Sequence, residues 1–594
     1  MPVKIVKETQ PWRTMIGRRG WVRPLVVVAL AATGVIVPMW VFGDASGHDF
    51  QFHVASWVEM VRQWHEGILF PRWAEWANWG YGEPRFIFYP PASRIIGAAF
   101  GLVLPWRTVA SAYTWLVLVG SGMAMWALAR ALLSKNEAVA AAIFFAVNPY
   151  SLVLVYYRSD FAELLAVALF PLLILAVLRI MQAGWAQVPF LALVFAAVWM
   201  CDAPAAVVAT YSTVLLLAVS YALQGKRTTL LSGAAGMACG FGLAAFYVLP
   251  AAYEQRWANL GFTIHGNYQF VQNFLFSRTG DPDFRLFNLR ISTIALGMIL
   301  VCALLALFVT RKPDIRILSW LLVVLGGASV FMMVWPSAFL WHLLPEMKFV
   351  QFPWRWLDAI APIFALFAAA ACGSWRKRSI VWTCIVVVIA GTGIAIARTT
   401  WWDSDSANDI ATWVRWGVGY DGTDEFAPPG SDRYALYAIN PTLEQPPANS
   451  IPITTEFNTA SNTLVPATDV RIHVEDWTAE RRVLTEESMR PVNLAFRLFT
   501  YPAWRVRLDG QYVTTRTTPA GTMWLRMPAG RHGIDLTFRR TWDRTVGAAI
   551  SLIAAILLLA WAVRKRFALP ESKTRCFYSS AITENRSKRP GSVK

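Results

Sequence analysis

Apolar stretches of about 20 residues, the length that crosses a hydrocarbon core, recur along the chain and are separated by shorter polar segments. The pattern predicts an α-helical polytopic membrane protein with about twelve transmembrane helices. The spans are expected at residues 24–42, 108–132, 137–157, 163–180, 184–200, 203–223, 228–251, 290–310, 314–336, 353–372, 378–397 and 546–563.

A shorter apolar stretch, residues 93–104, is bounded by Arg94 and by Pro105-Trp106-Arg107. It is too short to cross a bilayer comfortably, so we expect a re-entrant or interfacial helix. If it did cross, the loops that follow would change sides of the membrane.

The periodicity changes to that of β-strands from about residue 440 to 540. Apolar and polar residues alternate there, and Asp509-Gly510 is a hairpin turn signal. We expect a β-sandwich-like domain, preceded by an irregular segment, residues 401–439. Strands are predicted at 470–474, 494–498, 504–508 and 534–538.

These patterns divide the chain into five parts. They are a basic N-terminus (1–23), a transmembrane domain (24–397) whose first outer loop is 43–107, an outer domain (398–545) that is β-rich from about 440, a last span (546–563) and a basic tail (564–594).

The composition supports a membrane protein. Hydrophobic residues make up 56% and charged residues 15% of the 594 residues, whereas soluble chains carry roughly 25% charged residues. Soluble, disordered and small disulfide-rich classes are therefore excluded. None of the six cysteines falls within 398–543, so no disulfide framework is available to the outer domain.

The net charge of +17 is concentrated in the two termini. Basic residues beside membrane spans mark the cytoplasmic side and attract anionic lipids, so we expect both termini in the cytoplasm and residues 24–42 to be a retained span, not a signal peptide. No fold feature of a nucleic-acid-binding protein accompanies the charge. Loop 43–107, domain 398–545 and all seven histidines are then expected on the outer face.

The first outer loop holds the most informative polar residues. Asp49 lies beside His48, and His53 follows four residues later, so one helical turn would align Asp49 with His53. Ionisable groups at a membrane boundary are costly unless they are solvated or paired, which favours a site over a solvated loop. For Asp44 alone, a solvated loop is at least as good an interpretation as a site. Spacing places no third metal ligand with the two histidines.

Two other patterns in the sequence give weaker evidence of function. Gly417–Gly422 matches GxGxxG, but no strand-to-helix context surrounds it, and we interpret the match as chance. Tryptophans crowd the first outer loop, and for most of them a membrane-interface belt is a better interpretation than a sugar-binding face. They are Trp57, Trp64, Trp73, Trp76 and Trp79.

A set of short motifs resembles one family of bacterial membrane proteins. The chain is similar to YfhO-like proteins, and within them to the group called 6-pyruvoyl-tetrahydropterin synthase-related, a label that does not itself indicate pterin chemistry. That family is similar in turn to the GT-C superfamily of integral-membrane glycosyltransferases. The motifs are Gly47–His53, Phe70–Trp73, Gly80–Pro84, Phe88–Pro91, Tyr157–Glu163, Gln351–Arg355, Tyr501–Trp504 and Leu508–Gly510.

The resemblance implies an inner-membrane enzyme that transfers a sugar from a polyprenyl-phosphate donor to an extracytoplasmic glycan, lipid or protein. In the GT-C superfamily an acidic residue of the first outer loop serves the active site, and Asp49 matches it best, with Asp44 as the alternative. His53 stands where many relatives carry a second acid, which puts a role for a divalent cation in doubt.

A transfer of this kind needs a base for the acceptor hydroxyl and guanidinium groups for the departing phosphate. Asp49 is the expected base, and Arg158 and Arg355 are expected phosphate ligands at the outer ends of spans. An interfacial anchor is an equal interpretation of Arg355. Glu163 is expected to orient Arg158. Further substrate contacts are assigned to His48, Arg72 and Glu425, the last because it resembles a family position.

Two rival functions remain open at this point. Twelve spans also fit a transporter or flippase of lipid-linked sugars, but transporters place ionisable residues inside spans and show internal repeats, and neither feature stands out here. A non-catalytic scaffold for envelope glycan assembly, using the β-rich domain to bind glycan or a partner, is the second rival.

Overall fold

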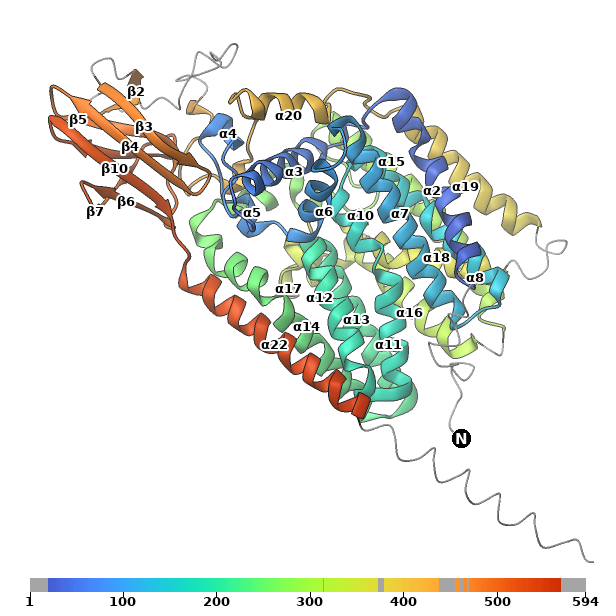
Figure 1. Cartoon of the computed structure of the whole chain (residues 1–594). Helices are drawn as coiled ribbons and strands as arrows, with labels where there is room; N and C mark the ends of the chain where they lie inside the picture. Colours follow the sequence, from blue (N-terminus) through green and yellow to red (C-terminus); the bar gives the residue numbers. More distant parts are fainter. Residues whose placement is uncertain are drawn as a thin grey trace, which may run out of the picture.

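The computed structural model describes residues 20–567 apart from 313–314, 372–378, 437–454, 460, 462 and 467–469. Most of both basic termini, residue 378 of one expected span and the start of the β-rich region near 440 lie outside the described residues. Within them, nine helical segments are long and apolar enough to cross a membrane, or ten if one bent pair of helices counts as a span. The chain is a mostly helical protein that ends in β-sheets and one further helix (Figure 1).

Eight of the predicted spans correspond to one segment each. Their bounds are Val22–Phe42 (α2), Trp106–Arg130 (α7), Lys135–Arg158 (α8, Lys135–Ala146; α9, Pro149–Leu152; η1, Val153–Arg158), Ala203–Gln224 (α13), Arg227–Trp257 (α14, Arg227–Glu254; η3, Gln255–Trp257), Pro282–Val309 (α15), Pro353–Ala371 (η10, Pro353–Trp356; α18, Leu357–Ala371) and Trp542–Val563 within α22 (Trp542–Phe567).

Two further predicted spans, 163–180 and 184–200, share one apolar segment of 41 residues. A straight helix of that length would measure about 60 Å, twice the thickness of a hydrocarbon core. Gly184, with φ +51°, interrupts it. The hydroxyl of Tyr113 donates to the carbonyl of Phe161 at 2.9 Å and interacts electrostatically with Cys201, so the two ends meet and the segment is a hairpin. Its elements are α10 (Phe161–Val167), α11 (Phe170–Ala183), η2 (Gly184–Gln187) and α12 (Val188–Cys201).

Two predicted spans remain, 314–336 and 378–397. Residues 314–336 are not one straight helix, because α16 (Arg316–Met332) is followed by a helical piece, Trp335–Leu343, bent by 91°. Pro336 at the start of that piece cannot donate a backbone hydrogen bond, which suits the break. The described helix α19 (Ser379–Ala397) covers the span expected at 378–397.

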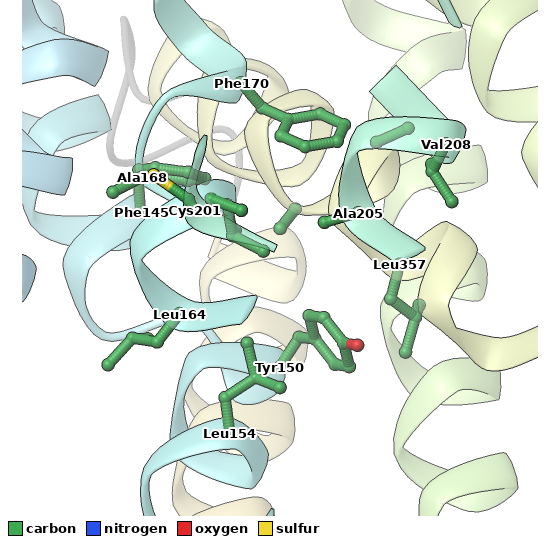
Figure 2. Packing of buried hydrophobic residues seen from close by; sticks show 14 of the residues in the cluster. Phe145, Tyr150, Leu154, Leu164, Ala168, Phe170, Cys201, Ala205, Val208 and Leu357 are labelled. Carbon is green, nitrogen blue, oxygen red and sulfur yellow. The ribbon is translucent and has the colours of Figure 1, made fainter. Parts of the chain in front are cut away.

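The stretch 93–104 forms a short helix, α6 (Pro91–Gly101), of 11 residues. It is not among the segments long enough to span. It packs against α3 (Phe50–His65), α7 and α12, and Arg94 bonds it to α5 (Arg85–Phe88) (Figure 1). A further short helix, α4 (Ala77–Gly80), precedes α5. The core beneath joins helices far apart in sequence, and Figure 2 shows Tyr150, Leu164 and Leu357 among its side chains.

The described part of the β-region forms two five-stranded antiparallel sheets, ordered β2-β1-β5-β9-β8 and β3-β4-β10-β6-β7. Inward residues of both sheets, such as Leu494 and Leu536, share one core, so the predicted sandwich is present. Asp509 and Gly510, both at positive φ, form the predicted turn. The strands are β1 (Thr455–Asn458), β2 (Thr463–Pro466), β3 (Val470–Thr478), β4 (Arg481–Ser488), β5 (Val492–Phe499), β6 (Trp504–Leu508), β7 (Gln511–Val513), β8 (Arg516–Thr517), β9 (Thr522–Met527) and β10 (Gly530–Phe538).

The first outer loop connects the helices to the sandwich. Trp73 is fully buried and its ring contacts those of Trp504 and Phe538. Gly82, at φ +74°, lies so close to the Trp73 indole that a Cβ would come within 2.1 Å of Nε1. The interface-belt interpretation is therefore wrong for Trp73, as it is for the fully buried Trp57. Sequence pattern could not separate these cases, because both uses favour the same residue type.

Candidate active site

Five charged side chains from loop 43–107 and from the ends of three spanning segments form a continuous chain of ion pairs. Arg158 holds Asp49 through Nε (2.9 Å) and Nη2, and Nη2 also lies 3.0 Å from Asp160. Arg355 lies 3.5 Å from Asp160 and 2.8 Å from Glu163. We call Asp49–Arg158–Asp160–Arg355–Glu163 the ion-pair chain. It joins four of the residues singled out in the sequence, Asp49, Arg158, Glu163 and Arg355.

Local backbone geometry brings Asp49 to Arg158. The Asp49 amide donates to the carbonyl of Arg158 at 2.8 Å, and the Gly47 amide donates to Ser159 Oγ at 3.0 Å. A Cβ at Gly47 would lie 2.5 Å from the carbonyl carbon of Arg158, so only glycine allows this approach. Ser159 turns the chain at φ +50°, and Asp160 then caps α10 by accepting the Glu163 amide at 2.9 Å.

His53 and Arg355 complete the surroundings. His53 Nε2 lies 3.4 Å from Asp160 Oδ1. One turn of α3 thus directs Asp49 and His53 at the same 158–160 segment. All three nitrogens of Arg355 are used, because Nη1 also donates to the carbonyl of Val350 and to Gln351. Arg158 keeps one buried donor, Nη1, without a partner among the described residues.

Asp49 is the accessible member of the chain. Its side chain is 33% exposed, against 5% or less for the other four. Both bonds from Arg158 go to Oδ2, so Arg158 leaves Oδ1 unbound. Burial acts to raise the pKa of Asp160, but His53 and the two guanidinium groups outweigh it and hold that pKa below its usual value. Asp49 is therefore the accessible acid of the ion-pair chain, and its other acids are buried.

Two more acids lie beside the chain and were missed in the sequence. Asp202, between α12 and α13, has its pKa raised to about 8 by burial and by the charge of Asp160. Asp358, the second residue of α18, is fully buried and interacts electrostatically with Glu163 and Asp202. Its position inside a predicted span was a usable signal, since an ionisable residue there is costly.

Three further residues singled out in the sequence, Asp44, His48 and Arg72, are not members of the ion-pair chain. Asp44 Oδ2 accepts the Ala407 amide at 3.1 Å, at the start of α20 (Ala407–Arg415), and burial raises its pKa to about 6. His48 is exposed and its ring packs against Phe287 and Trp401. Arg72 pairs with Glu480 at the joint with the sandwich, a placement that gives its expected substrate role no support.

Glu425 faces the same region from another part of the chain. It lies in η12 (Asp424–Phe426), is partly accessible, and burial raises its pKa to about 7. The phenol of Tyr268, in η5 (Gly266–Tyr268), is within electrostatic range of Glu425, Asp49 and Arg158. Tyr268 therefore lies close enough to both Asp49 and Glu425 to interact with their charges.

The residues present do not fit a divalent cation. Within the described part of the chain, no group of three or more His, Cys, Asp or Glu side chains is arranged as metal ligands. The acids nearest Asp49 are paired with arginines instead. No step is therefore derived through a metal.

A second buried network holds the first outer loop in place. Glu59 on α3 is fully buried, and its Oε1 accepts the Trp76 amide at 2.5 Å and the Tyr420 hydroxyl at 3.1 Å. Burial and the neighbouring Glu75 raise the pKa of Glu59 to about 7. The network ties the loop that carries Asp49 to Tyr420.

We expect Glu59→Gln to reduce the loss of thermal stability between pH 5 and pH 8. An acid with a higher pKa in the folded state binds its proton more tightly there, so stability falls as pH rises from its ordinary value of 4.5 to about 7. A shift of that size is worth on the order of 3 kcal/mol. Unfolding temperatures in detergent at the two pH values measure it, and an equal pH difference in both proteins would contradict the expectation.

A model of the family described as "6-pyruvoyl-tetrahydropterin synthase related domain; membrane protein" matches residues 86–401, more than half of the chain. The match includes three of the motifs on which the sequence resemblance rested, Phe88–Pro91, Tyr157–Glu163 and Gln351–Arg355, and confirms that resemblance. No curated protein matches the sequence.

Three solved structures are similar at low identity. ArnT from Cupriavidus metallidurans bound to undecaprenyl phosphate has 13% identity and a TM-score of 0.40, covering 67% of this chain and 69% of its own. The arabinofuranosyltransferase AftD from Mycobacteria has 11% identity and a TM-score of 0.44, over 89% and 60%. The Archaeoglobus fulgidus oligosaccharyltransferase in its apo form has 14% identity and a TM-score of 0.34, over 74% and 59%.

Proposed function

We propose that this chain, which belongs to the family of 6-pyruvoyl-tetrahydropterin synthase related membrane proteins, is a membrane glycosyltransferase. It transfers a sugar from a polyprenyl-phosphate donor to an extracytoplasmic acceptor, in a bacterial inner membrane with both termini in the cytoplasm. One observation carries the proposal. Asp49, in loop 43–107, is paired with Arg158 through Oδ2 while its side chain remains 33% exposed.

The proposed reaction follows from that geometry. An acceptor hydroxyl beside Oδ1 of Asp49 gives its proton to the carboxylate while its oxygen attacks the anomeric carbon of the sugar. The bond from that carbon to the phosphate oxygen breaks, and its electron pair leaves with the lipid phosphate. Arg158 keeps the carboxylate oriented, because its Nε and Nη2 both engage Oδ2.

The departing phosphate needs hydrogen-bond donors, and the two arginines differ in what they can offer. Among the described residues, Nη1 of Arg158 has no acceptor, which suits it to bind a phosphate oxygen. Arg355 is fully engaged by protein acceptors. We therefore assign phosphate binding to Arg158 and a positioning role to Arg355, in place of two equivalent ligands.

Glu425 and one aromatic pair suit the substrates. Glu425 is partly accessible and, with a pKa raised to about 7, is protonated in part of the molecules at neutral pH, so it can donate to or accept from sugar hydroxyls. His48 and the 55% exposed Trp401 form an aromatic surface, and such surfaces stack on sugar faces. The identity of the sugar and of the acceptor is left to experiment.

Transfer in detergent is the test that separates an enzyme from a transporter. The purified full chain in micelles, with polyprenyl-phosphate-linked sugars and envelope glycan or lipid extracts, should move label into an acceptor, since micelles have no two sides to transport between. Mass spectrometry of envelope glycans in a deletion strain identifies which acceptor to supply. If the deletion removes a sugar modification but the micellar protein transfers nothing to the unmodified glycan, the flippase or scaffold function replaces this proposal.

A further inference from the structure

Arg94 is a buried arginine without a charged partner. It lies on α6 and is 3% exposed. Only Nη1 is hydrogen bonded, to the carbonyls of Phe86 (2.8 Å) and Tyr89 (3.3 Å), and Nε and Nη2 have no partner within the described part of the chain. No carboxylate is within ion-pair distance there. A guanidinium group stays protonated, so a positive charge is left uncompensated inside the protein.

The other buried arginines around the site are neutralised. Arg158 and Arg355 pair with the acids of the ion-pair chain, and Arg85 pairs with Glu83 at 2.5 Å. Arg544 is likewise bonded to Glu254. Because an unpaired buried charge is costly, Arg94 stands out among the buried arginines near the ion-pair chain. Elsewhere in the described residues, Arg482 of the sandwich is likewise buried without a carboxylate partner.

The surroundings of Arg94 indicate where an anion would come from. Apolar side chains exposed around it include Leu69 (81%), Phe70 (41%) and Ile95 (39%). The Phe70 ring lies over the guanidinium, 5.3 Å away, and contacts Phe246 of α14. Exposed apolar surface of this kind suits contact with lipid. Phe70 itself is 41% exposed, so the group that covers Arg94 lies at the surface.

Arg94 is also connected to the ion-pair chain. The peptide carbonyl that it binds belongs to Tyr89, whose ring packs on His53 at 5.6 Å and lies within electrostatic range of Asp160 and Asp49. Tyr89 therefore connects a group held at Arg94 to the acids of the ion-pair chain. Such a group would lie beside α6, near the Phe70 ring that contacts α14.

We propose that Arg94 is a membrane-side phosphate site that receives the lipid-linked phosphate before it reaches Asp49, covered by Phe70 until the lipid arrives. The two free nitrogens of Arg94 match two oxygens of one phosphate group. The negative charge of the phosphate neutralises the guanidinium group, and the lipid chain remains among the exposed apolar residues beside it. This inference rests on the proposed function but concerns binding, and it is tested without catalysis.

Binding of decaprenyl phosphate to the full chain in phosphatidylcholine nanodiscs is the first measurement. A hydrogen bond to a charged group contributes about 1.5–3 kcal/mol, so Arg94→Gln should weaken binding by roughly 10- to 150-fold. The matched control is Arg256→Gln, because Arg256 also lies over two aromatic rings, of Tyr253 and Trp257, but is exposed. It should bind as the wild type does. Equal affinity in Arg94→Gln overturns the proposal, as does complete displacement by millimolar inorganic phosphate, which would indicate a free-anion site.

Accessibility of Arg94 provides a second measurement that does not require an arginine variant to fold. In Phe70→Ala, phenylglyoxal should modify Arg94 and decaprenyl phosphate should protect it, as read by peptide mass spectrometry. Absence of modification, or modification without protection, overturns the proposal. Arg94-dependent binding in a protein that transfers no sugar would refute the transferase function alone, and transfer with Arg94-independent binding would refute this site alone.

Discussion

Asp49→Asn is expected to lower the rate of sugar transfer by about 10²- to 10⁴-fold, the usual contribution of a general base. Asparagine can still accept from Arg158 through its amide oxygen, so the loop should keep its position. It cannot take a proton from the acceptor hydroxyl at neutral pH. The measurement is the initial rate of transfer by purified protein at saturating donor, with donor binding determined separately.

The control for this variant is Asp283→Asn. Asp283 is an exposed carboxylate in the first turn of α15, outside the ion-pair chain, and the variant should be fully active. Unchanged donor binding with a lost rate would assign Asp49 to the chemical step. A fully active Asp49→Asn would show that Asp49 is not the general base. Glu425, which is partly accessible, would then be the next candidate.

Arg355→Met is expected to have the largest effect on stability. Arg355 neutralises Glu163 and Asp160, which are 0% and 3% exposed. Breaking a buried pair by removing one partner leaves an uncompensated charge and costs about 3–5 kcal/mol, a large part of the stability of most domains. The yield of monodisperse protein from membranes and its unfolding temperature should both fall steeply.

A second substitution distinguishes the loss of charge balance from a loss of packing. In Arg355→Met with Glu163→Gln, the unpaired carboxylate is gone, and the glutamine can still accept from Tyr150, which bonds Glu163 in the wild type. Part of the stability should return. Arg415→Met, at the exposed end of α20, should behave as the wild type. If the double variant is no better than the single one, the cost lies in packing and not in charge.

The sequence predicted the members of the ion-pair chain better than their roles. Asp49, Arg158, Glu163 and Arg355 could be singled out because charged residues at span ends are costly and matched family motifs. Which acid pairs with which arginine could not be predicted, since Asp49 and Arg158 are 109 residues apart. They meet because the Gly47 and Asp49 amides donate to Ser159 Oγ and to the carbonyl of Arg158. Glu163 was expected to orient Arg158, but its direct partner is Arg355.

Asp160, Asp202 and Asp358 show the same limit from the other side. Asp202 and Asp358 are lone acids in the sequence, at a turn and inside an apolar run, whereas Asp160 belongs to the motif Tyr157–Glu163. Nothing local says that the three gather. Tertiary packing brings three chain segments to one point and decides which acids are buried. Arg94 lacks an anionic partner among the described residues. This too can be seen only in the tertiary structure, because it depends on all the neighbouring side chains.

By itself, the sequence determined that this is a membrane protein, where most helices run, and that a β-sandwich precedes the last helix. These features follow from the length of apolar stretches and from residue periodicity, which are local properties. The tertiary structure alone decided that residues 161–201 form a hairpin, that Trp73 belongs to the sandwich core and that Arg94 lacks an anion. These features depend on contacts between distant residues, and local preference cannot specify such contacts because many side chains of the same type compete for them.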